Sequence, residues 1–271
     1  MELNEPEVIF NSIVEQTKEF FENSMLDKVV IGLSGGVDSA LVAAIAVRAL
    51  GSENVTAIAM PSRISSSTSM NLAIRQARAL DIDLIFTPIH DMFEAFTDEV
   101  NQWYPQYDYE PMIYENLQAR IRGVILFAWT NANPDGTAVF STGNRTESLL
   151  GYCTIQGDTT GAWNPINSLY KTEVYELCNY INKDGEVILQ DIIDRPPTAE
   201  LSEGQIDEEA FGLSYKYIDA ILKLYCDDEM TDINAEIDDE YSNRIINMVS
   251  KNKFKYRYYA PGPNILGRKL V

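Results

Sequence analysis

The chain has 271 residues, of which 45% are hydrophobic and 23% charged, as in an ordinary globular protein with enough material for a large core. Its net charge of −20 argues against nucleic acid as the main partner, because phosphate backbones are bound by clustered Lys and Arg. No segment approaches the run of about 18 apolar residues needed to span a membrane, and the acidic N-terminus lacks an apolar signal region. We therefore expect a single cytoplasmic domain over residues 1–271.

Three cysteines and one histidine limit the possible chemistry. Cys153, Cys178 and Cys226 are odd in number and show no C-x-x-C spacing, so we interpret them as reduced thiols. His90 follows a predicted strand without a nucleophile elbow, which favours a structural role over a catalytic triad. The chemistry should therefore depend on a metal ion and cationic side chains.

The first part of the chain alternates between helical and extended patterns. Helices are predicted over residues 7–25, 41–50 and 70–80, the last capped by a Ser-rich loop at 64–69, and strands over 28–31, 54–60 and 83–89. This order predicts a doubly wound parallel sheet with right-handed crossovers and helices on both faces. Ligands should then bind beyond the carboxyl ends of the strands.

A glycine-rich stretch joins the first strand to its helix. In Gly32-Leu33-Ser34-Gly35-Gly36-Val37-Asp38-Ser39, the glycines allow close backbone approach and the helix N-terminus favours an anion. Asp38 would repel phosphate unless it held a divalent cation. The spacing differs from both common phosphate-binding glycine motifs. A plain Ser-capped turn is the alternative, but the string resembles the pyrophosphate loop of the N-type ATP pyrophosphatases.

The middle of the chain contains a short helix at 92–100, an aromatic turn at 103–109 and a long helix at 113–132. The turn could serve a small core, an interface or base stacking. On the long helix we expect an apolar inner face, formed by Leu117, Ile121, Val124, Ile125, Phe127 and Ala128. Arg120 and Arg122 are two positions apart, so they should point to different sides. At least one of them would be available for an anion or a partner subunit, or would simply be solvated.

A fourth strand at 137–141 leads into a polar segment at 142–147, followed by a glycine-containing loop at 151–162. Glu147 could provide a second carboxylate for the metal of Asp38, or it could be an ordinary capping-box glutamate. Lys171 begins the predicted helix 172–181, where the helix dipole disfavours a cation. An anionic ligand there would explain its position.

The last third of the chain begins with a turn-rich acidic segment at 195–209, predicted to be a mobile lid. Two helices follow at 214–226 and 236–250. The basic stretch 251–257 could be a solvated tail or could reach a phosphate.

Together these motifs resemble the ammonia-dependent NAD synthetases over residues 6–261. The matching strings are the loop at 32–39, Met60-Pro61-Ser62, residues 116–122, 142–147, 151–152, 157–158, 169–173, 197–201, 205–208 and 213–215. The resemblance implies an adenine nucleotide alpha-hydrolase-like, Rossmann-like fold. It also implies a two-step reaction, in which the nicotinate carboxylate of deamido-NAD is adenylated by ATP and ammonia then displaces AMP to give NAD.

The resemblance assigns roles to particular positions. Residues Gly32, Leu33, Ser34, Gly35, Gly36, Val37, Asp38 and Ser39, with Met60, Thr142, Lys171 and Thr198, would bind ATP. Asp38 and Glu147 would hold Mg²⁺, and Asp38 and Lys171 would be the catalytic pair. Arg120, Tyr256 and Arg257 would bind deamido-NAD. The family also implies a homodimer, in which the 103–109 turn and the helix 113–132 would take part.

Some positions depart from the family pattern. A Lys that some relatives carry eight positions after the metal glutamate is Ile155 here, an Asp fifteen positions after it is Ala162, and a His-Lys pair is Tyr256-Arg257. Asp158 and Lys253 are candidates to replace these contacts. Since the chain has no room for a glutaminase domain, we expect free ammonia as nitrogen donor.

Two other functions stay open at this point. One is another amidating or thiolating ATP pyrophosphatase, for example one resembling the synthetase domain of GMP synthetase. The other is a nucleotide-binding protein without turnover, suggested by the changed dinucleotide positions.

Overall fold

A computed structural model describes residues 5–103, 111–133, 136–198, 207–231, 239–265 and 267–268. Its centre is a four-stranded sheet of β1 (Lys28–Gly32), β2 (Val55–Ala59), β3 (Asp83–Phe86) and β4 (Thr137–Phe140). The strands run parallel in the order β3-β2-β1-β4, with Val30 of β1 opposite both Thr56 and Val139. The predicted parallel α/β sheet is confirmed. The strand order reverses between β1 and β4, which is where ligands bind in such sheets.

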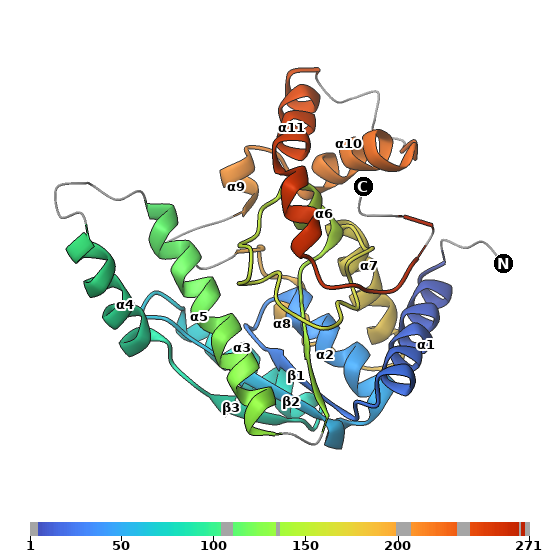
Figure 1. Ribbon diagram of the computed structural model, residues 1–271. Coiled ribbons are helices and arrows are strands. Elements are labelled where there is room, and N and C mark those ends of the chain that lie inside the picture. Colours follow the sequence, from blue (N-terminus) through green and yellow to red (C-terminus); the bar gives the residue numbers. More distant parts are fainter. Residues whose placement is uncertain are drawn as a thin grey trace.

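Helices cover both faces of the sheet (Figure 1). Alternate residues of a strand point to opposite faces. Val29 and Ile31 pack on the face covered by α1 (Pro6–Ser24), α2 (Val37–Leu50), α3 (Ser67–Ala79), α7 (Lys171–Ile181) and α8 (Gln190–Ile193). Val30 and Val139 pack on the other face, against α4 (His90–Trp103) and α5 (Pro111–Ala132). The sheet is therefore doubly wound, as predicted.

A second group of helices lies at the top of the view in Figure 1, away from the sheet. It comprises α6 (Arg145–Leu150), α9 (Asp207–Phe211), α10 (Tyr215–Asp227) and α11 (Asp239–Asn252). Leu149, Phe211, Ile218, Ile245 and Val249 form its buried core. Short 3₁₀ segments occur at η1 (Ser52–Asn54), η2 (Asn182–Asp184) and η4 (Lys253–Tyr258). Within the described ranges, no helix combines the length and apolar character needed to cross a membrane.

The inner face predicted for the long helix is partly wrong. In α5, Ile121 and Leu126 are buried, whereas Val124 and Phe127 are 67% and 47% exposed and Ala128 is exposed as well. The helix is apolar around much of its circumference, but the sheet covers only one side. Apolar content alone therefore assigned too many residues to the core.

Two further predictions need correction. His90 does not end the third strand: β3 stops at Phe86, and His90 begins α4 with its Nε2 atom 2.9 Å from Asp91 Oδ1. Thr87 and Ile89 still donate from their amides to the carbonyls of Ala59 and Pro61, but Pro61 has no N–H group to return a bond to Thr87, so the regular ladder ends at Phe86. Residues 207–209, the end of the predicted lid, belong to α9 (Asp207–Phe211). Residues 199–206 of the predicted lid, residues 104–109 of the aromatic turn and residues 236–238 lie outside the described residues.

Candidate functional site

A cavity of about 470 Å³ opens beyond the carboxyl ends of the strands, at the point where the strand order reverses. Residues 32–39 follow β1, Met60 follows β2 and Thr142 follows β4, so three strand ends meet at one cavity. Residues from α5, α6 and α7 complete its wall, together with Thr198 and Lys255. The parallel topology thus brings segments that are far apart in the sequence to one cavity.

The loop after β1 is held by its own serines. Ser34 Oγ lies 3.1 Å from Ser39 Oγ and accepts a hydrogen bond from the Gly36 amide at 3.2 Å. Gly35 has a φ of +83°, and a side chain there would collide with the Ser69 carbonyl oxygen. Gly36 is the N-cap of α2 and provides no side-chain cap. The first turn of α2 therefore faces the cavity with its positive dipole end, as an anion site requires.

Three charged side chains converge on one wall of the cavity. Lys171 Nζ lies 2.5 Å from Asp38 Oδ2 and 3.3 Å from Glu147 Oε1, so α2, α6 and α7 each contribute one charge. Asn144 is fully buried and donates from Nδ2 to Asp38 Oδ1 at 2.9 Å. The same Asn144 side chain accepts from the Glu147 amide, completing a capping box. Glu147 is therefore both a capping residue and a member of the charged group.

Burial and charge shift the pKa values in this group. Burial disfavours the Lys171 ammonium, but Asp38 and Glu147 together hold its pKa above the usual value. Burial raises the pKa of Glu147 to about 8, Lys171 opposes that rise and Asp38 adds to it. The ammonium is charged at neutral pH, and burial favours the protonated form of the Glu147 carboxyl group.

The same carboxylates fit a magnesium ion. Mg²⁺ is usually held by one or two carboxylates together with substrate phosphates and water, and Asp38 and Glu147 face each other across the Lys171 ammonium. In the described part of the chain, no group of three His, Cys, Asp or Glu residues has the arrangement of a complete protein metal site. A cation here would therefore need ligands from a bound nucleotide.

The opposite part of the cavity is formed by α5 and the loop 151–162. Arg122 donates from Nε to the Met60 carbonyl at 3.1 Å, and Lys255 Nζ donates to the carbonyls of Gly151 and Cys153 at 2.6 and 2.7 Å. Asp158 accepts from the Thr154 amide, and burial raises its pKa to about 6. Within the described residues, this half of the lining carries two cations, Arg122 and Lys255, and two carboxyl groups, Glu115 and Asp158.

The structure brings most of the predicted residues together. Lining the cavity are Gly32, Leu33, Ser34, Gly36, Val37, Asp38, Ser39, Met60, Thr142, Glu147, Lys171 and Thr198. Gly35, Arg120, Tyr256 and Arg257 are not part of the lining. Arg120 is exposed and donates to the Ile155 carbonyl at 3.2 Å, and the Tyr256 hydroxyl donates to the Leu149 carbonyl at 3.2 Å. Arg257 and Lys253 are exposed.

Sequence reasoning did not assign Asn144 or Lys255 to the site, and it named Arg122 only as one of two arginines of which at least one could bind an anion or a partner subunit. The N-x-x-E spacing of a capping box was a signal for Asn144. Arg122 was expected to point away from Arg120, and their different carbonyl partners confirm that expectation. Lys255 was one of several cations in the basic stretch, and only the tertiary structure distinguishes it from its neighbours.

Comparison with known proteins gives a consistent result. A family model described as NAD synthase matches residues 9–259. A glutamine-dependent NAD(+) synthetase of Acinetobacter baylyi is 38% identical over 96% of this chain and 48% of its own length. An NH3-dependent NAD synthetase from Campylobacter jejuni has a TM-score of 0.74 at 32% identity, covering 93% of this chain and 96% of that one. An NMN synthetase from Francisella tularensis has a TM-score of 0.80 at 28% identity, covering 93% and 95%.

The chain spans about half the length of the curated relatives that it matches. The matched part includes the strand ends, the loop after β1 and the charged group at Lys171. The match extends over nearly the whole chain, and the fold agrees with solved members. The chain therefore belongs to the NAD synthase family.

Proposed function

We propose that this chain uses ATP and ammonia to amidate deamido-NAD, forming NAD through an adenylated intermediate. The observation that carries this proposal is a single cavity with two different halves. One half holds the glycine loop and the group of Asp38, Glu147 and Lys171, which suits a triphosphate. In the other half, Arg122 and Lys255 line the cavity, and we assign these two cations to the anionic acceptor.

The reaction has two balanced steps. First, an oxygen of the nicotinate carboxylate attacks the α-phosphorus of ATP, and the bond from that phosphorus to the β-bridging oxygen breaks to release pyrophosphate. Second, ammonia attacks the acyl carbon, the bond to the AMP oxygen breaks and a proton leaves the nitrogen. Both steps need stabilisation of negative charge that develops on phosphate oxygens.

The residues of the first half fit that demand. The amides at the start of α2 and the Lys171 ammonium are fixed before ATP binds, so they need little reorganisation during the reaction. Asp38 and Glu147 would hold Mg²⁺, which would supply further neutralisation of the leaving pyrophosphate. Lys171 lines the same part of the cavity, where its ammonium could contact the nucleotide phosphates.

A second acceptor has a specific observation in its favour. The solved NMN synthetase from Francisella tularensis matches this chain with a TM-score of 0.80, and the positions Ile155 and Ala162 lack the polar side chains expected for a dinucleotide. Arg120, Tyr256 and Arg257 also lie outside the cavity lining. A deamidated nicotinate mononucleotide is therefore the alternative acceptor, with the same chemistry at the carboxylate.

We further propose that the chain acts as a homodimer in the cytoplasm. Exposed apolar side chains gather on α4 and α5, including Phe96, Trp103, Val124 and Phe127. A face of this kind is typical of a subunit interface. Val124→Asp should shift the protein to a monomer in sedimentation velocity; an unchanged mass would place the interface elsewhere. The three free cysteines fit a reducing compartment.

Product analysis tests the proposed reaction. The protein is incubated with ATP, Mg²⁺, ammonium and one acceptor at a time: deamido-NAD, the deamidated mononucleotide, or xanthosine monophosphate. We expect equal amounts of AMP and NAD with deamido-NAD and none without ammonium. Higher kcat/KM with the mononucleotide would select the second acceptor. AMP release only with xanthosine monophosphate would favour the other amidating enzyme, and ATP binding without AMP release would indicate a protein without turnover.

A further inference from the structure

The position of the Lys171 side chain depends on the start of α7. Three consecutive backbone amides there donate to side chains: Tyr170 to Glu173 Oε2 at 3.0 Å, Lys171 to Thr146 Oγ1 at 2.8 Å and Thr172 to Asp219 Oδ2 at 2.8 Å. Among the described contacts, Glu173 is the only one of these three acceptors that belongs to α7 itself. Its carboxylate therefore fixes the turn from which Lys171 extends.

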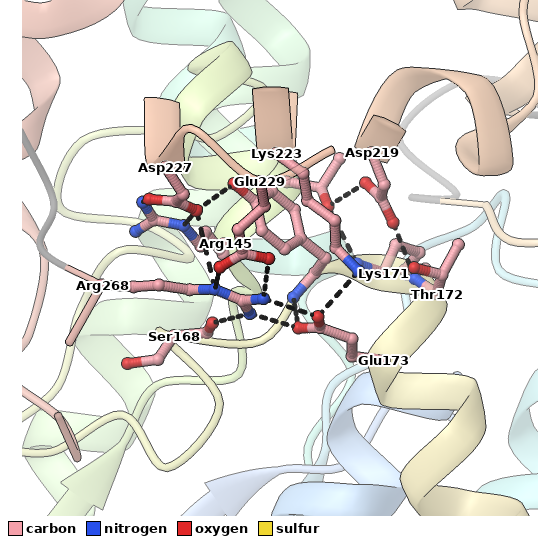
Figure 2. Close-up of polar contacts among 12 residues, drawn as sticks. Arg145, Ser168, Lys171, Thr172, Glu173, Asp219, Lys223, Asp227, Glu229 and Arg268 are labelled. Atoms are coloured by element: carbon pink, nitrogen blue, oxygen red, sulfur yellow. Dashed lines mark hydrogen bonds and ion pairs between the residues drawn. The ribbon is translucent and has the colours of Figure 1, made fainter. Parts of the chain in front are cut away.

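Glu173 is held in turn by two cations from distant parts of the chain (Figure 2). Arg268 donates to both carboxylate oxygens, from Nη1 at 2.6 Å and from Nη2 at 2.9 Å. Lys223 of α10 lies 2.8 Å from Oε1. Burial raises the pKa of Glu173, but hydrogen bonds and charge from Arg268 and Lys223 lower it below its usual value. A paired, two-point contact of this kind fixes orientation as well as charge.

Arg268 is itself fixed by several partners, although it lies 97 positions after Lys171 in the sequence. It donates to Glu229 from Nε at 3.0 Å and from Nη2 at 2.8 Å, and to the Ser168 carbonyl from Nη1 at 3.3 Å. Its guanidinium carbon lies 4.8 Å from the centre of the buried Tyr170 ring. Only 3% of its side chain is exposed.

The Tyr170 ring is the centre of a balanced group of charges. Arg145, Lys223 and Arg268 lie near the ring, and the Tyr170 hydroxyl donates to Asp227 Oδ2 at 2.5 Å. Asp227 also pairs with Arg145 at 2.6 Å. Three cations therefore meet three carboxylates, those of Glu173, Asp227 and Glu229. Buried pairs of this kind are costly to break, because removing one member leaves an uncompensated charge.

We propose that Arg268 is a positioning residue for Lys171, acting through Glu173 and the Tyr170 amide on the first turn of α7. The effect on turnover rests on the proposed role of Lys171 in ATP cleavage, but the effect on the position of Lys171 does not. A purely structural arginine would change stability alone. A positioning residue also changes where the Lys171 amine lies in the folded protein.

The test uses Arg268→Lys, which keeps the charge but loses the two-point contact, and Arg75→Lys as its matched control. Arg75 also pairs with a carboxylate, Asp191, at 2.6 Å, but it is 46% exposed and lies outside the cavity lining. Each folded protein is treated with a small amine-acylating reagent. Modification of Lys171 is then measured by mass spectrometry relative to Lys183, which is solvent-exposed.

We expect Lys171 to be acylated at least fivefold faster in Arg268→Lys than in the wild type, and at the wild-type rate in Arg75→Lys. In the same preparations, kcat for AMP formation should fall at least tenfold, whereas KM for ATP stays within twofold. Unchanged acylation and unchanged kcat, with only a lower unfolding temperature, would overturn the proposal.

A milder variant keeps the test decisive if Arg268→Lys does not fold. Glu229→Gln removes one carboxylate that holds Arg268, at a side chain that is 37% exposed, and leaves the pair with Glu173 in place. It should double the acylation rate of Lys171. An unchanged acylation rate would count against the proposal. If the wild type forms no AMP, the proposed function is refuted. If Lys171 is nevertheless acylated faster in the variant, the positioning role of Arg268 still holds.

Discussion

The two halves of the cavity differ in how their residues are held. In the phosphate half, Asp38, Glu147 and Lys171 contact one another directly, and Asn144 ties the first two together. In the acceptor half, Lys255 donates to the backbone carbonyls of Gly151 and Cys153. The phosphate half is thus held by contacts between charged side chains, whereas Lys255 in the acceptor half is anchored by the backbone.

This difference predicts how each half responds to change. A network of buried charges loses much of its function when one member is removed, because its partners are left unpaired. Removal of a cation that is anchored by backbone carbonyls, such as Lys255, should cost only the contribution of that cation.

Asp38→Asn should have the largest effect. It removes the proposed metal ligand and the closer partner of the Lys171 ammonium, at 2.5 Å, so AMP formation should fall by about 10³-fold, roughly 4 kcal/mol. Circular dichroism should show an intact fold. Asp91→Asn, at an acid on the exposed start of α4, serves as control and should keep wild-type turnover. A wild-type rate in Asp38→Asn would show that the metal assignment is wrong.

Asp219→Asn should change how the free energy of unfolding depends on pH, because Asp219 is a buried acid behind the phosphate half. Burial raises the pKa of Asp219 to about 6, while hydrogen bonds from Thr146 and Thr172 oppose the rise. The folded state therefore binds this proton more tightly than the unfolded chain. The stabilisation contributed by the protonated Asp219 carboxyl group is present below about pH 4 and is lost as the pH rises through 6.

The Asn variant cannot lose that proton. The difference in unfolding free energy, variant minus wild type, should therefore rise by about 2 kcal/mol between pH 4 and pH 7 in urea titrations. A difference independent of pH would mean that Asp219 is already ionised at pH 4 in the folded protein.

Lys255→Met should affect the acceptor half alone. KM for the acceptor should rise about tenfold, near 1.4 kcal/mol, with KM for ATP unchanged, because Lys255 contacts the loop at 151–162 and not the glycine loop. Lys251→Met, at an exposed lysine of the same basic stretch, is the matched control and should resemble the wild type. Equal increases in both KM values would show that the two halves are not separate.

Arg120→Ala should have the smallest effect. Arg120 is exposed and outside the cavity lining, so KM for deamido-NAD should rise about threefold, roughly 0.7 kcal/mol, and more than KM for ATP. With the mononucleotide as acceptor we expect no change. Steady-state kinetics with both acceptors measures this directly, and equal effects on deamido-NAD and ATP would remove the assigned role of Arg120.

The same contrast explains what the sequence could predict. The phosphate half follows from short strings at strand ends, since parallel topology brings the loop at 32–39, Thr142 and Glu147 to one edge. The odd position of Lys171 at a helix start was also visible, and the structure pairs it with two carboxylates. Local motifs and strand order together were sufficient there.

Local motifs and strand order could not predict the acceptor half or the contacts that support α7. Lys255 reaches the cavity because η4 packs beside the loop at 151–162, a contact between segments about a hundred residues apart. Arg268 carries no local signal, because its partners Glu173 and Glu229 are distant in sequence. The exposed side of α5 was not predicted, because the helix carries more apolar residues than the sheet can cover.

The central claim is that the phosphate half activates a carboxylate bound in the acceptor half by transferring AMP to it. The most direct measurement uses deamido-NAD labelled with ¹⁸O in its nicotinate carboxylate, with ATP, Mg²⁺ and ammonium, followed by mass spectrometry of the AMP formed. Adenylation of the carboxylate predicts that each AMP carries one ¹⁸O atom. AMP without the label would contradict the account, because its oxygen would then have come from water.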